Sequence, residues 1–370
     1  MRLLIGGGGT GGHLFPAIAV AREWLSRFPE GEVLIVGARR PLDIRILEES
    51  GFPHRLIFAG GLKGMSLWRK LRSLLRLGWG GLQALAILGA FRPDVVLGTG
   101  GYASAPVVIA SWLLRRPIVL MEPNTCPGAA NRFLSRMASR IALGLPGGEE
   151  CFPPGKPLFT GNPIRREIER LPETTSPGQD AFTLLILGGS QGARAINEAV
   201  LQALPSWSKA QPPPRIIHIT GEGDLGRLKE AYAKWGIEAE VSSFIRDMAN
   251  TYRRAHLVLA RGGALTVSEL AAAGCPAILV PLPSKTGFHQ FMNASYLSQG
   301  GGAFLIPQKE LQSRLAETVL SLGSDPARLQ EMARASRSLS KPGASQHIVD
   351  LLFSVTQRKS EEPELDRRSG

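Results

Sequence analysis

Three glycine-rich segments, each following a short apolar run, have the composition of anion-binding turns. They comprise residues 6–13, 188–194 and 261–269. Glycine has no Cβ, so its backbone can adopt positive φ and approach a ligand closely. A helix that starts after such a turn points free amides and the positive end of its dipole at an anion. The segments predict phosphate binding, and for any one alone a ligand-free strand-to-helix turn is the alternative.

The first segment also fits the dinucleotide-binding pattern G-x-G-x-x-G through Gly6, Gly8 and Gly11. That pattern keeps a dinucleotide-dependent oxidoreductase as a competing hypothesis. The next strand ends in residues 37–40 without the acidic residue that binds the ribose of NAD, so only an NADP form based on Arg39 stays open. A P-loop ATPase is disfavoured because the chain lacks the pattern G-x-x-x-x-G-K-[S/T].

Glu269 lies about one turn inside the helix that we expect after the third segment. Its carboxylate can accept hydrogen bonds from a ribose diol. The simpler alternative is that it compensates the positive end of the helix dipole. Two glycine-rich segments in the same half of the chain favour a diphosphate site beside it.

Short apolar runs alternate with segments of helical periodicity along most of the chain. We expect strands at residues 2–5, 33–36, 94–97, 117–120, 140–143, 182–187, 215–219, 257–260 and 277–280. Buried strands separated by helices predict an α/β protein with two doubly wound parallel-sheet domains. Residues 146–157 and 171–180, rich in Gly, Pro, Ser and Thr, predict a hinge. A last helix is expected at 344–355, before a charged tail expected to be disordered.

The composition is that of an ordinary globular protein, with 44% hydrophobic and 20% charged residues. The formal net charge of +12 favours an anionic partner, which could be nucleic acid, acidic lipid or a phosphorylated substrate. The three cysteines are scattered without metal-ligand spacing and fit a reduced, cytoplasmic location. Strand-like residues begin almost at Met1, so we expect no signal peptide.

Seven motifs follow one another over nearly the whole chain. They are residues 8–13 with Phe15 and Pro16, 97–102, 161–165, 188–194, 244–245, 263–269 and 289–294. Together and in this order they resemble the motifs of the MurG family of N-acetylglucosaminyltransferases, part of glycosyltransferase family 28.

The resemblance implies a GT-B fold, in which two Rossmann-like domains place the active site in a cleft. Residues 1–162 would be the acceptor and membrane domain, with a helix at about 342–357 packing back onto it. Residues 163–341 would bind the donor, and residues 358–370 would form the disordered tail.

The implied reaction is the inverting transfer of N-acetylglucosamine from UDP-N-acetylglucosamine to lipid I, undecaprenyl-pyrophosphoryl-N-acetylmuramyl-pentapeptide. The product would be lipid II, for peptidoglycan synthesis, cell shape and cell division. We expect no cofactor and no metal, because no Asp-x-Asp motif or His/Asp cluster suggests one. Another lipid or small-molecule acceptor, or a nucleotide-sugar-binding protein without turnover, are the alternatives.

The resemblance also assigns donor contacts. Ile245 would hold the uracil, Glu269 the ribose, and Ser190 with Arg165 the diphosphate. The remaining UDP-N-acetylglucosamine contacts would be Thr10, Gly11, Gly12, Asn124, Ala264, Leu265, Thr266, Val267, Ser268 and Gln290.

The chain departs from the family where the usual His-Glu-Gln-Asn becomes residues 121–124, Met-Glu-Pro-Asn. Glu122 and Asn124 are retained, but no role of the missing His and Gln can be assigned to Met121 or Pro123. Gly262 likewise replaces the usual Ser of an Arg-Ser-Gly motif.

His13 and Glu122 are the predicted catalytic residues. An inverting transfer needs a base for the acceptor hydroxyl, and a neutral histidine with its ordinary pKa of about 6.5 can serve. Glu122 could act directly or could orient His13. The alternative for His13 is a residue at a helix start whose ring is bonded to the backbone.

Residues 60–91 combine apolar side chains at helical spacing with a basic face. The basic side chains are Lys63, Arg69, Lys70, Arg72 and Arg76. This pattern fits an interfacial element on an anionic membrane surface, or a core helix with a solvated basic edge. A lipid-linked acceptor favours peripheral attachment at the cytoplasmic face of the cell membrane. Cell-wall synthesis proteins are further expected partners, and nucleic acid is not.

Overall fold

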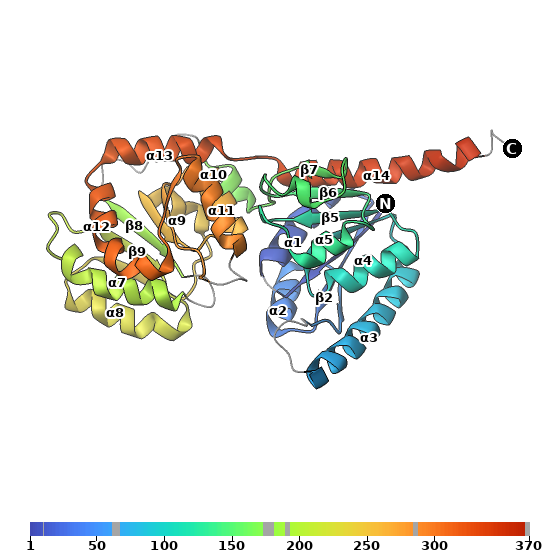
Figure 1. Ribbon diagram of the computed structural model, residues 1–370, viewed down its shortest axis with the longest axis horizontal. Coiled ribbons are helices and arrows are strands. Elements are labelled where there is room, and N and C mark those ends of the chain that lie inside the picture. Colours follow the sequence, from blue (N-terminus) through green and yellow to red (C-terminus); the bar gives the residue numbers. More distant parts are fainter. Residues whose placement is uncertain (10, 61–66, 173–180, 189–192, 284–287, 367–370) are drawn as a thin grey trace. The chain divides into compact units, whose positions relative to one another are not determined.

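The structure, a computed structural model, describes residues 1–9, 11–60, 67–172, 181–188, 193–283 and 288–366. Within these ranges, the side chains of residues 67–77 and 358–366 are not described. The chain divides into two compact units, Met1–Ile164 with Gly343–Gly370, and Arg165–Pro342 (Figure 1).

The first unit is built on a seven-stranded parallel sheet with the strand order β3-β2-β1-β4-β5-β6-β7. Its strands are β1 (Arg2–Gly8), β2 (Glu32–Ala38), β3 (His54–Ile57), β4 (Val95–Gly101), β5 (Ile118–Glu122), β6 (Arg140–Leu143) and β7 (Pro157–Phe159). Its helices are α1 (Gly11–Arg27), α2 (Pro41–Ser50), α3 (Leu67–Phe91), α4 (Ser104–Leu113), α5 (Ala129–Leu134), the 3-10 helix η1 (Glu149–Cys151) and α14 (Ala344–Asp366).

Alternate residues of β1 enter two different cores of this unit. Leu3 and Ile5 pack with α1, α2 and α14, whereas Leu4 packs with α3 and α4 on the opposite face. Successive side chains of a strand point to opposite faces, so a strand covered on both faces must be apolar at every position. Helix α14 belongs to this core through Ile348 and Leu352, which are fully buried.

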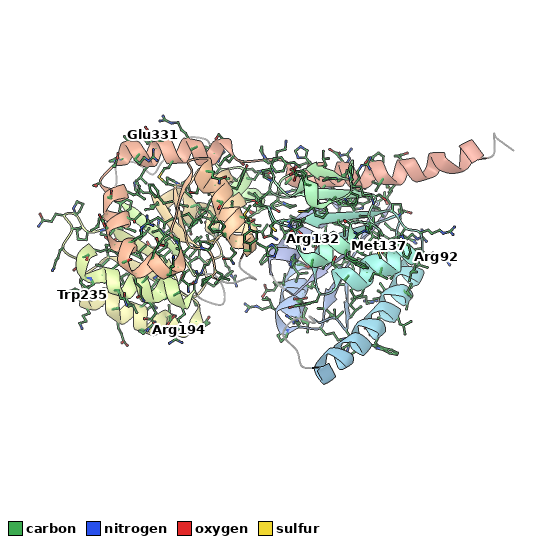
Figure 2. The ribbon with its side chains drawn as sticks, viewed as in Figure 1. Arg92, Arg132, Met137, Arg194, Trp235 and Glu331 are labelled. Atoms are coloured by element: carbon green, nitrogen blue, oxygen red, sulfur yellow. The ribbon has the colours of Figure 1, made fainter. Side chains whose placement is uncertain are left out.

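The second unit repeats the design with six parallel strands in the order β10-β9-β8-β11-β12-β13. These are β8 (Thr183–Leu187), β9 (Arg215–Ile219), β10 (Ala239–Ser242), β11 (Leu257–Ala260), β12 (Ala277–Leu279) and β13 (Ala303–Leu305). The helices are α6 (Arg166–Glu169), α7 (Arg194–Trp207), η2 (Glu222–Asp224), α8 (Leu225–Lys234), α9 (Met248–Arg254), α10 (Ala264–Ala273), α11 (Phe288–Gln299), η3 (Gln308–Glu310), α12 (Leu311–Gly323) and α13 (Pro326–Ser338). Side chains fill the space between sheet and helices in each unit (Figure 2).

The prediction of two doubly wound parallel sheets is confirmed. Four strands were not predicted, namely β3, β7, β10 and β13. All four are edge strands that are short and only partly buried, so they give a weaker sequence signal than the central strands. No described helix is long and apolar enough to cross a membrane.

Two sequence expectations differ from the observed backbone. Residues 146–157 lie inside the first unit, where they form η1 and lead into β7, whereas the chain passes to the second unit between Ile164 and Arg165. Helix α14 continues to Asp366, beyond the expected end at 355 and into the tail expected to be disordered from 358. The residues just after 355 include the good helix formers Gln, Arg, Lys and Glu, which extend the helix. The expected hinge residues 173–180 lie outside the described part of the chain.

Candidate functional site

In the first unit, β1 and β4 are neighbours whose chain connections run in opposite directions from the centre of the sheet. Ligands of such sheets bind beyond the carboxyl ends of the strands at this switch point. Both strands end in glycine there, and Gly7 and Gly8 pair with Gly100 and Gly101. The first two sequence motifs therefore lie side by side at the expected ligand position.

His13 lies in the first turn of α1, directly above this strand end. Its Nδ1 lies 2.9 Å from the backbone oxygen of Thr99, and a carbonyl can only accept, so Nδ1 carries the proton. In the neutral ring, Nε2 is then the unprotonated nitrogen. Among the described residues, no group pairs with Nε2. The pKa of His13 is lowered by burial, against the opposing effects of the Thr99 carbonyl, Glu122 and Asp43. This arrangement leaves Nε2 able to accept a proton.

The seat of the His13 ring requires glycine at positions 100 and 101. Gly100 and Gly101 have φ of 89° and 77°, the left-handed region in which side chains are strained. A Cβ on Gly100 would lie 2.9 Å from His13 Nδ1, and one on Gly101 would lie 1.7 Å from the Gly8 oxygen. The second glycine turn thus accommodates and positions the His13 imidazole.

Glu122, at the end of β5, has a carboxylate that is saturated with donors from its own loop. Its Oε1 accepts from the backbone N and the Nδ2 of Asn124, at 3.0 and 2.9 Å. Its Oε2 accepts from the backbone N of Gly128 at 3.2 Å and from Asn131 Nδ2 at 2.9 Å. The side chain is 2% exposed. Glu122 therefore orders the loop and fixes the Asn124 amide, and no hydrogen bond joins it to His13.

Asp43, in the first turn of α2, was not predicted from the sequence. Its two carboxylate oxygens accept the Gly9 N–H at 2.9 and 2.8 Å, and Oδ2 also accepts from Ala38 N at 3.1 Å. Asp43 is fully buried. It holds the first glycine segment in place from below, as Asn131 holds the Glu122 loop. Their only sequence signal is a polar residue near the start of a short helix.

Met121 and Pro123, which stand where the family usually has His and Gln, accept hydrogen bonds through their backbone carbonyls. Met121 is fully buried in the core, and its carbonyl accepts from Asn131 Nδ2 at 3.1 Å. The carbonyl of Pro123 accepts from Asn162 Nδ2 at 3.0 Å. Every residue has a backbone carbonyl, so the loop can make these hydrogen bonds with Met and Pro at the two positions.

In the second unit, β8 and β11 form the corresponding switch point. Helix α10 starts just beyond β11, and its N-cap Gly263 supplies no side chain to its first amides. The uncapped amides are those of the helix start, at residues 264–266. Val267 has a fully buried side chain, and its N–H bonds to the Gly263 carbonyl at 2.9 Å, so its role is packing. Ser268 follows, half-buried.

Glu269 lies one turn further along α10 and has two partners. The Tyr252 hydroxyl donates to its Oε2 at 3.1 Å, and Arg165 Nη1 lies 3.8 Å from its Oε1. Burial raises the pKa of Glu269, while Arg165 and the Tyr252 hydrogen bond oppose the rise. Its side chain keeps 15% exposure and that of Arg165 keeps 37%, so a ligand can reach both. Glu269 and Arg165, which are predicted to contact the ribose and the diphosphate, are therefore adjacent in this unit.

Gly262 brings α11 close to the start of α10. A Cβ on Gly262 would lie 2.3 Å from the Gln290 carbonyl oxygen, and Asn293 Nδ2 donates to the Gly262 carbonyl at 3.1 Å. The side chain of Gln290 accepts from Leu282 N at 3.2 Å. Gln290, one of the predicted donor contacts, is thereby fixed beside the third glycine segment.

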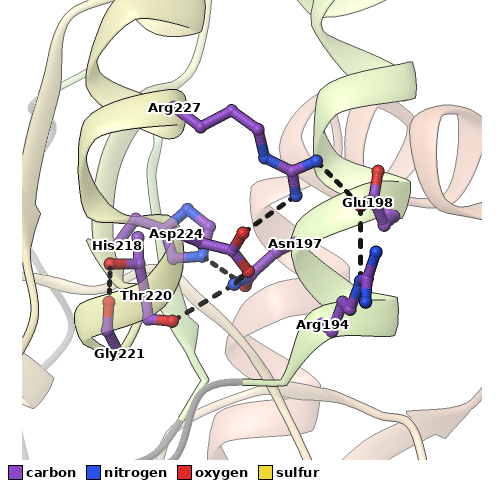
Figure 3. Close-up of polar contacts among 8 residues, drawn as sticks. All are labelled: Arg194, Asn197, Glu198, His218, Thr220, Gly221, Asp224 and Arg227. Carbon is purple, nitrogen blue, oxygen red and sulfur yellow. Dashed lines mark hydrogen bonds and ion pairs between the residues drawn. The ribbon is translucent and has the colours of Figure 1, made fainter.

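A buried polar network connects α7 with β9 in the second unit (Figure 3). His218 Nδ1 and Tyr232 OH are 2.9 Å apart, and His218 Nε2 lies 3.2 Å from Asn197 Oδ1. Asn197 Nδ2 donates to Thr220 O at 3.1 Å and to Asp224 Oδ2 at 2.7 Å. The network joins α7, β9 and α8 just beyond Gly188, whose N–H donates to Ile219 O at 2.8 Å.

Charged groups continue this network to the surface. Arg227 pairs with Asp224 at 3.0 Å and with Glu198 at 2.8 Å, and Glu198 lies 3.9 Å from Arg194. The side chain of Arg194, the last residue of the second segment, is 88% exposed at the surface of the unit (Figure 2).

The other predicted contacts are placed as follows. Gly11 and Gly12 open α1, and Ile245 lies half-buried in the loop between β10 and α9. Asn124 lies in the Glu122 loop of the first unit. Thr10 and Ser190 are outside the described residues. No group of three or more His, Cys, Asp and Glu in the described part of the chain could hold a metal ion.

Comparisons with known proteins agree with this geometry. Residues 3–143 match the N-terminal domain of glycosyltransferase family 28, and residues 183–348 match its C-terminal domain. A UDP-N-acetylglucosamine--N-acetylmuramyl-(pentapeptide) pyrophosphoryl-undecaprenol N-acetylglucosamine transferase from Geobacter sulfurreducens is 42% identical over 97% of this chain and all of its own length. The enzyme of the same name from Syntrophotalea carbinolica is 44% identical, over 96% and 99% of the two chains. The crystal structure of Acinetobacter baumannii MurG superposes with a TM-score of 0.78 at 29% identity, over 95% and 99% of the two chains.

The two parallel-sheet units with glycine turns at their switch points are those of a glycosyltransferase with the GT-B fold. The chain belongs to glycosyltransferase family 28 and, within it, to the MurG family of N-acetylglucosaminyltransferases.

Proposed function

We propose that this enzyme transfers N-acetylglucosamine from UDP-N-acetylglucosamine to lipid I, forming lipid II for peptidoglycan synthesis. The full-length similarity to transferases of that name supports the substrates. The observation that carries the chemistry is the His13 ring, whose Nδ1–H is held by Thr99 so that Nε2 is left as the base.

The donor half of the site lies in the second unit. Glu269 accepts the ribose hydroxyls, while Arg165 and the uncapped amides at the start of α10 face the diphosphate. Negative charge grows on UDP as it leaves, and fixed amides and a guanidinium stabilise it without reorganising. Ile245 holds the uracil, and Gln290 with Asn124 reads the sugar.

The acceptor half lies at the glycine turns of the first unit. His13 Nε2 removes the proton from the acceptor hydroxyl as its oxygen attacks the anomeric carbon. The bond from that carbon to the UDP oxygen breaks on the opposite face, so the configuration inverts. A neutral imidazole is needed, and the lowered pKa of His13 supplies it at neutral pH.

The enzyme attaches peripherally to the anionic cytoplasmic face of the membrane. Exposed apolar side chains on α3 and at the end of α4 support this attachment, namely Trp79, Leu82, Trp112, Leu113 and Leu114. The two helices pack together, and Arg115 and Arg116 follow α4 directly. Apolar groups beside basic ones suit an anionic bilayer surface. The basic side chains expected at residues 63–76 lie outside the described side chains. This location fits roles in cell shape and division beside other cell-wall synthesis proteins.

The test is transfer of labelled sugar from UDP-N-acetylglucosamine to a lipid I analogue. We expect lipid-linked label, and we expect UDP-N-acetylglucosamine but not NADPH to raise the melting temperature. Binding of the donor without lipid-linked product would refute the transferase function, and protection by NADPH would favour an oxidoreductase.

A companion measurement tests the donor site by calorimetry. Glu269→Ala removes the acceptor of the ribose hydroxyls and should weaken UDP binding about ten-fold or more, since hydrogen bonds to a charged group are strong. Unchanged UDP affinity would disprove this assignment.

A further inference from the structure

Arg40 carries a guanidinium fixed beside the first glycine segment. Its guanidinium carbon lies 4.1 Å from the centroid of the Tyr102 ring, a cation–π stack. Arg40 is also the N-cap residue of α2 and is half-buried. In the described part of the chain, no carboxylate pairs with it. The stack therefore holds an unneutralised positive charge in one place.

Tyr102 connects this charge to the glycine turns. A Cβ on Gly9 would lie 2.5 Å from Tyr102 Cδ2, so the ring packs directly on the Gly9 backbone. The Tyr102 N–H also donates to the Gly8 oxygen at 3.3 Å. The Arg40 side chain consequently lies at the same strand end as His13.

The buried carboxylate of Asp43 is the reason that an anion at the first glycine segment would need a cation beside it. It takes the Gly9 N–H with both oxygens, so that amide is not available to a ligand. Asp43 is fully buried and forms no ion pair among the described residues. A buried carboxylate beneath a turn repels an anion above it unless a positive charge compensates. Arg40 is the guanidinium stacked at this turn.

We propose that Arg40, stacked on Tyr102, binds the pyrophosphate of the lipid acceptor. The inference rests on the proposed function, in which the donor diphosphate is bound by the second unit. A guanidinium presents paired N–H donors that match phosphate oxygens, which a lysine cannot reproduce. Arg40 thereby selects acceptors that carry a diphosphate and sets the position of the sugar hydroxyl relative to His13.

The experiment compares Arg40→Gln with the matched control Arg39→Gln. Arg39 is the preceding residue and also stacks on a ring, with 4.5 Å to the Phe58 centroid, but the Phe58 ring is not a close neighbour of the glycine turns that the structure describes. Steady-state kinetics use a water-soluble, short-chain acceptor, so that membrane binding does not contribute. We expect Arg40→Gln to raise the acceptor KM about ten-fold or more while the donor KM stays within two-fold. Arg39→Gln should change neither by more than about two-fold.

A second acceptor that carries a monophosphate isolates the interaction. For each protein, kcat/KM is compared between the pyrophosphate and the monophosphate acceptor, as in a double-mutant cycle. The decrease in kcat/KM should be much larger for wild type than for Arg40→Gln. Tyr102→Phe keeps the aromatic ring, so the stack and the wild-type acceptor KM should be retained. Tyr102→Leu removes the ring and should raise the acceptor KM. Equal effects of Arg40→Gln and Arg39→Gln, or an equal loss with both acceptors, would overturn the inference.

The proposed function and this inference fail differently. Absence of transfer by wild type to either acceptor would remove the proposed function. Equilibrium binding of the pyrophosphate acceptor to wild type and Arg40→Gln would then decide the inference separately. Weaker binding by Arg40→Gln than by wild type supports the inference, and equal binding by the two proteins contradicts the inference.

Discussion

His13 and Glu122 differ in how their acceptor atoms are occupied. The Nε2 of His13 faces no described partner, whereas the carboxylate of Glu122 accepts four hydrogen bonds from its loop. A carboxylate that already has four donors is a poor base, because each donor stabilises the charged form. These contacts support the proposal that His13 removes the proton, while Glu122 orders its loop.

Glu122→Gln tests this division of roles. Its amide would present donors to donors, so we expect the free energy of unfolding to fall by about 1–3 kcal/mol. We also expect kcat to fall about ten-fold or more, because Asn124 loses its orientation. The fall in rate at low pH, which we expect from protonation of His13, should remain in this variant; it is the acid limb of the pH–rate profile. Asn131→Ala is the matched variant, since it breaks the same network from a residue with no predicted substrate contact, and it should behave alike. Loss of the acid limb in Glu122→Gln alone would make Glu122 the base.

At the scale of elements, the approach of α11 to α10 depends on a missing side chain. The family usually has Ser where this chain has Gly262, and here a Cβ would lie 2.3 Å from the Gln290 backbone oxygen. A backbone atom cannot move away without moving the helix. Gly262→Ser should therefore raise the donor KM several-fold with little change in the acceptor KM.

A second substitution, Gly263→Ser, changes the neighbouring position without this clash. A Cβ there meets nothing nearer than 3.5 Å, and serine is a favoured N-cap residue. Its side chain would bond the first amides of α10, so it tests the amides directly. An unchanged donor KM in Gly262→Ser would show that α11 already has room.

The network that joins α7, β9 and α8 makes stability depend on pH. Asn197 Nδ2 is a donor in two bonds, so its Oδ1 accepts from His218 Nε2, and His218 Nδ1 accepts from Tyr232. The histidine is thus held neutral. Burial lowers the pKa of His218 from 6.5 to about 3.

The sign of the effect follows from proton binding. Below pH 6.5 the unfolded chain protonates this histidine and the folded chain does not, until the pH reaches about 3. We therefore expect the His218 contribution to the free energy of unfolding to fall by about 1.4 kcal/mol for each unit by which the pH is lowered across that window. Chemical denaturation of wild type and His218→Gln between pH 7 and 5 measures it, with the half-buried His54→Gln as control. Identical slopes in wild type and His218→Gln would contradict the neutral, buried histidine.

At the scale of the whole molecule, the exposed apolar side chains of α3 and α4 predict membrane attachment. Trp112→Ser with Leu113→Ser should reduce co-sedimentation with anionic vesicles several-fold, since about 25 cal/mol per Å² of apolar burial is lost. Neutral vesicles and high salt should weaken wild-type binding through the basic residues. Trp235→Ser, an exposed tryptophan of the second unit, is the control. Equal binding by all three proteins would place the membrane contact elsewhere.

Central strands and glycine turns were predictable because their signals are local. A strand buried on both faces must lack polar side chains, as β1 does from Leu3 onward, and a turn that contacts the His13 ring through its backbone must be glycine. Edge strands such as β7 bury too little to show a pattern. The supporting residues were not predictable. Asp43 reaches Gly9 across 34 positions and Thr99 reaches His13 across 86, and only the folded sheet brings them together.

The pH–rate profile of sugar transfer to the lipid acceptor, measured for wild type and His13→Gln, tests the central claim most directly. The account predicts a wild-type rate that rises with pH through a pKa below 6.5 and then levels off, because only the neutral imidazole accepts the proton. His13→Gln should transfer about 10²–10⁴-fold more slowly and lack that limb. A variant with the wild-type rate, or with the same acid limb, would contradict it.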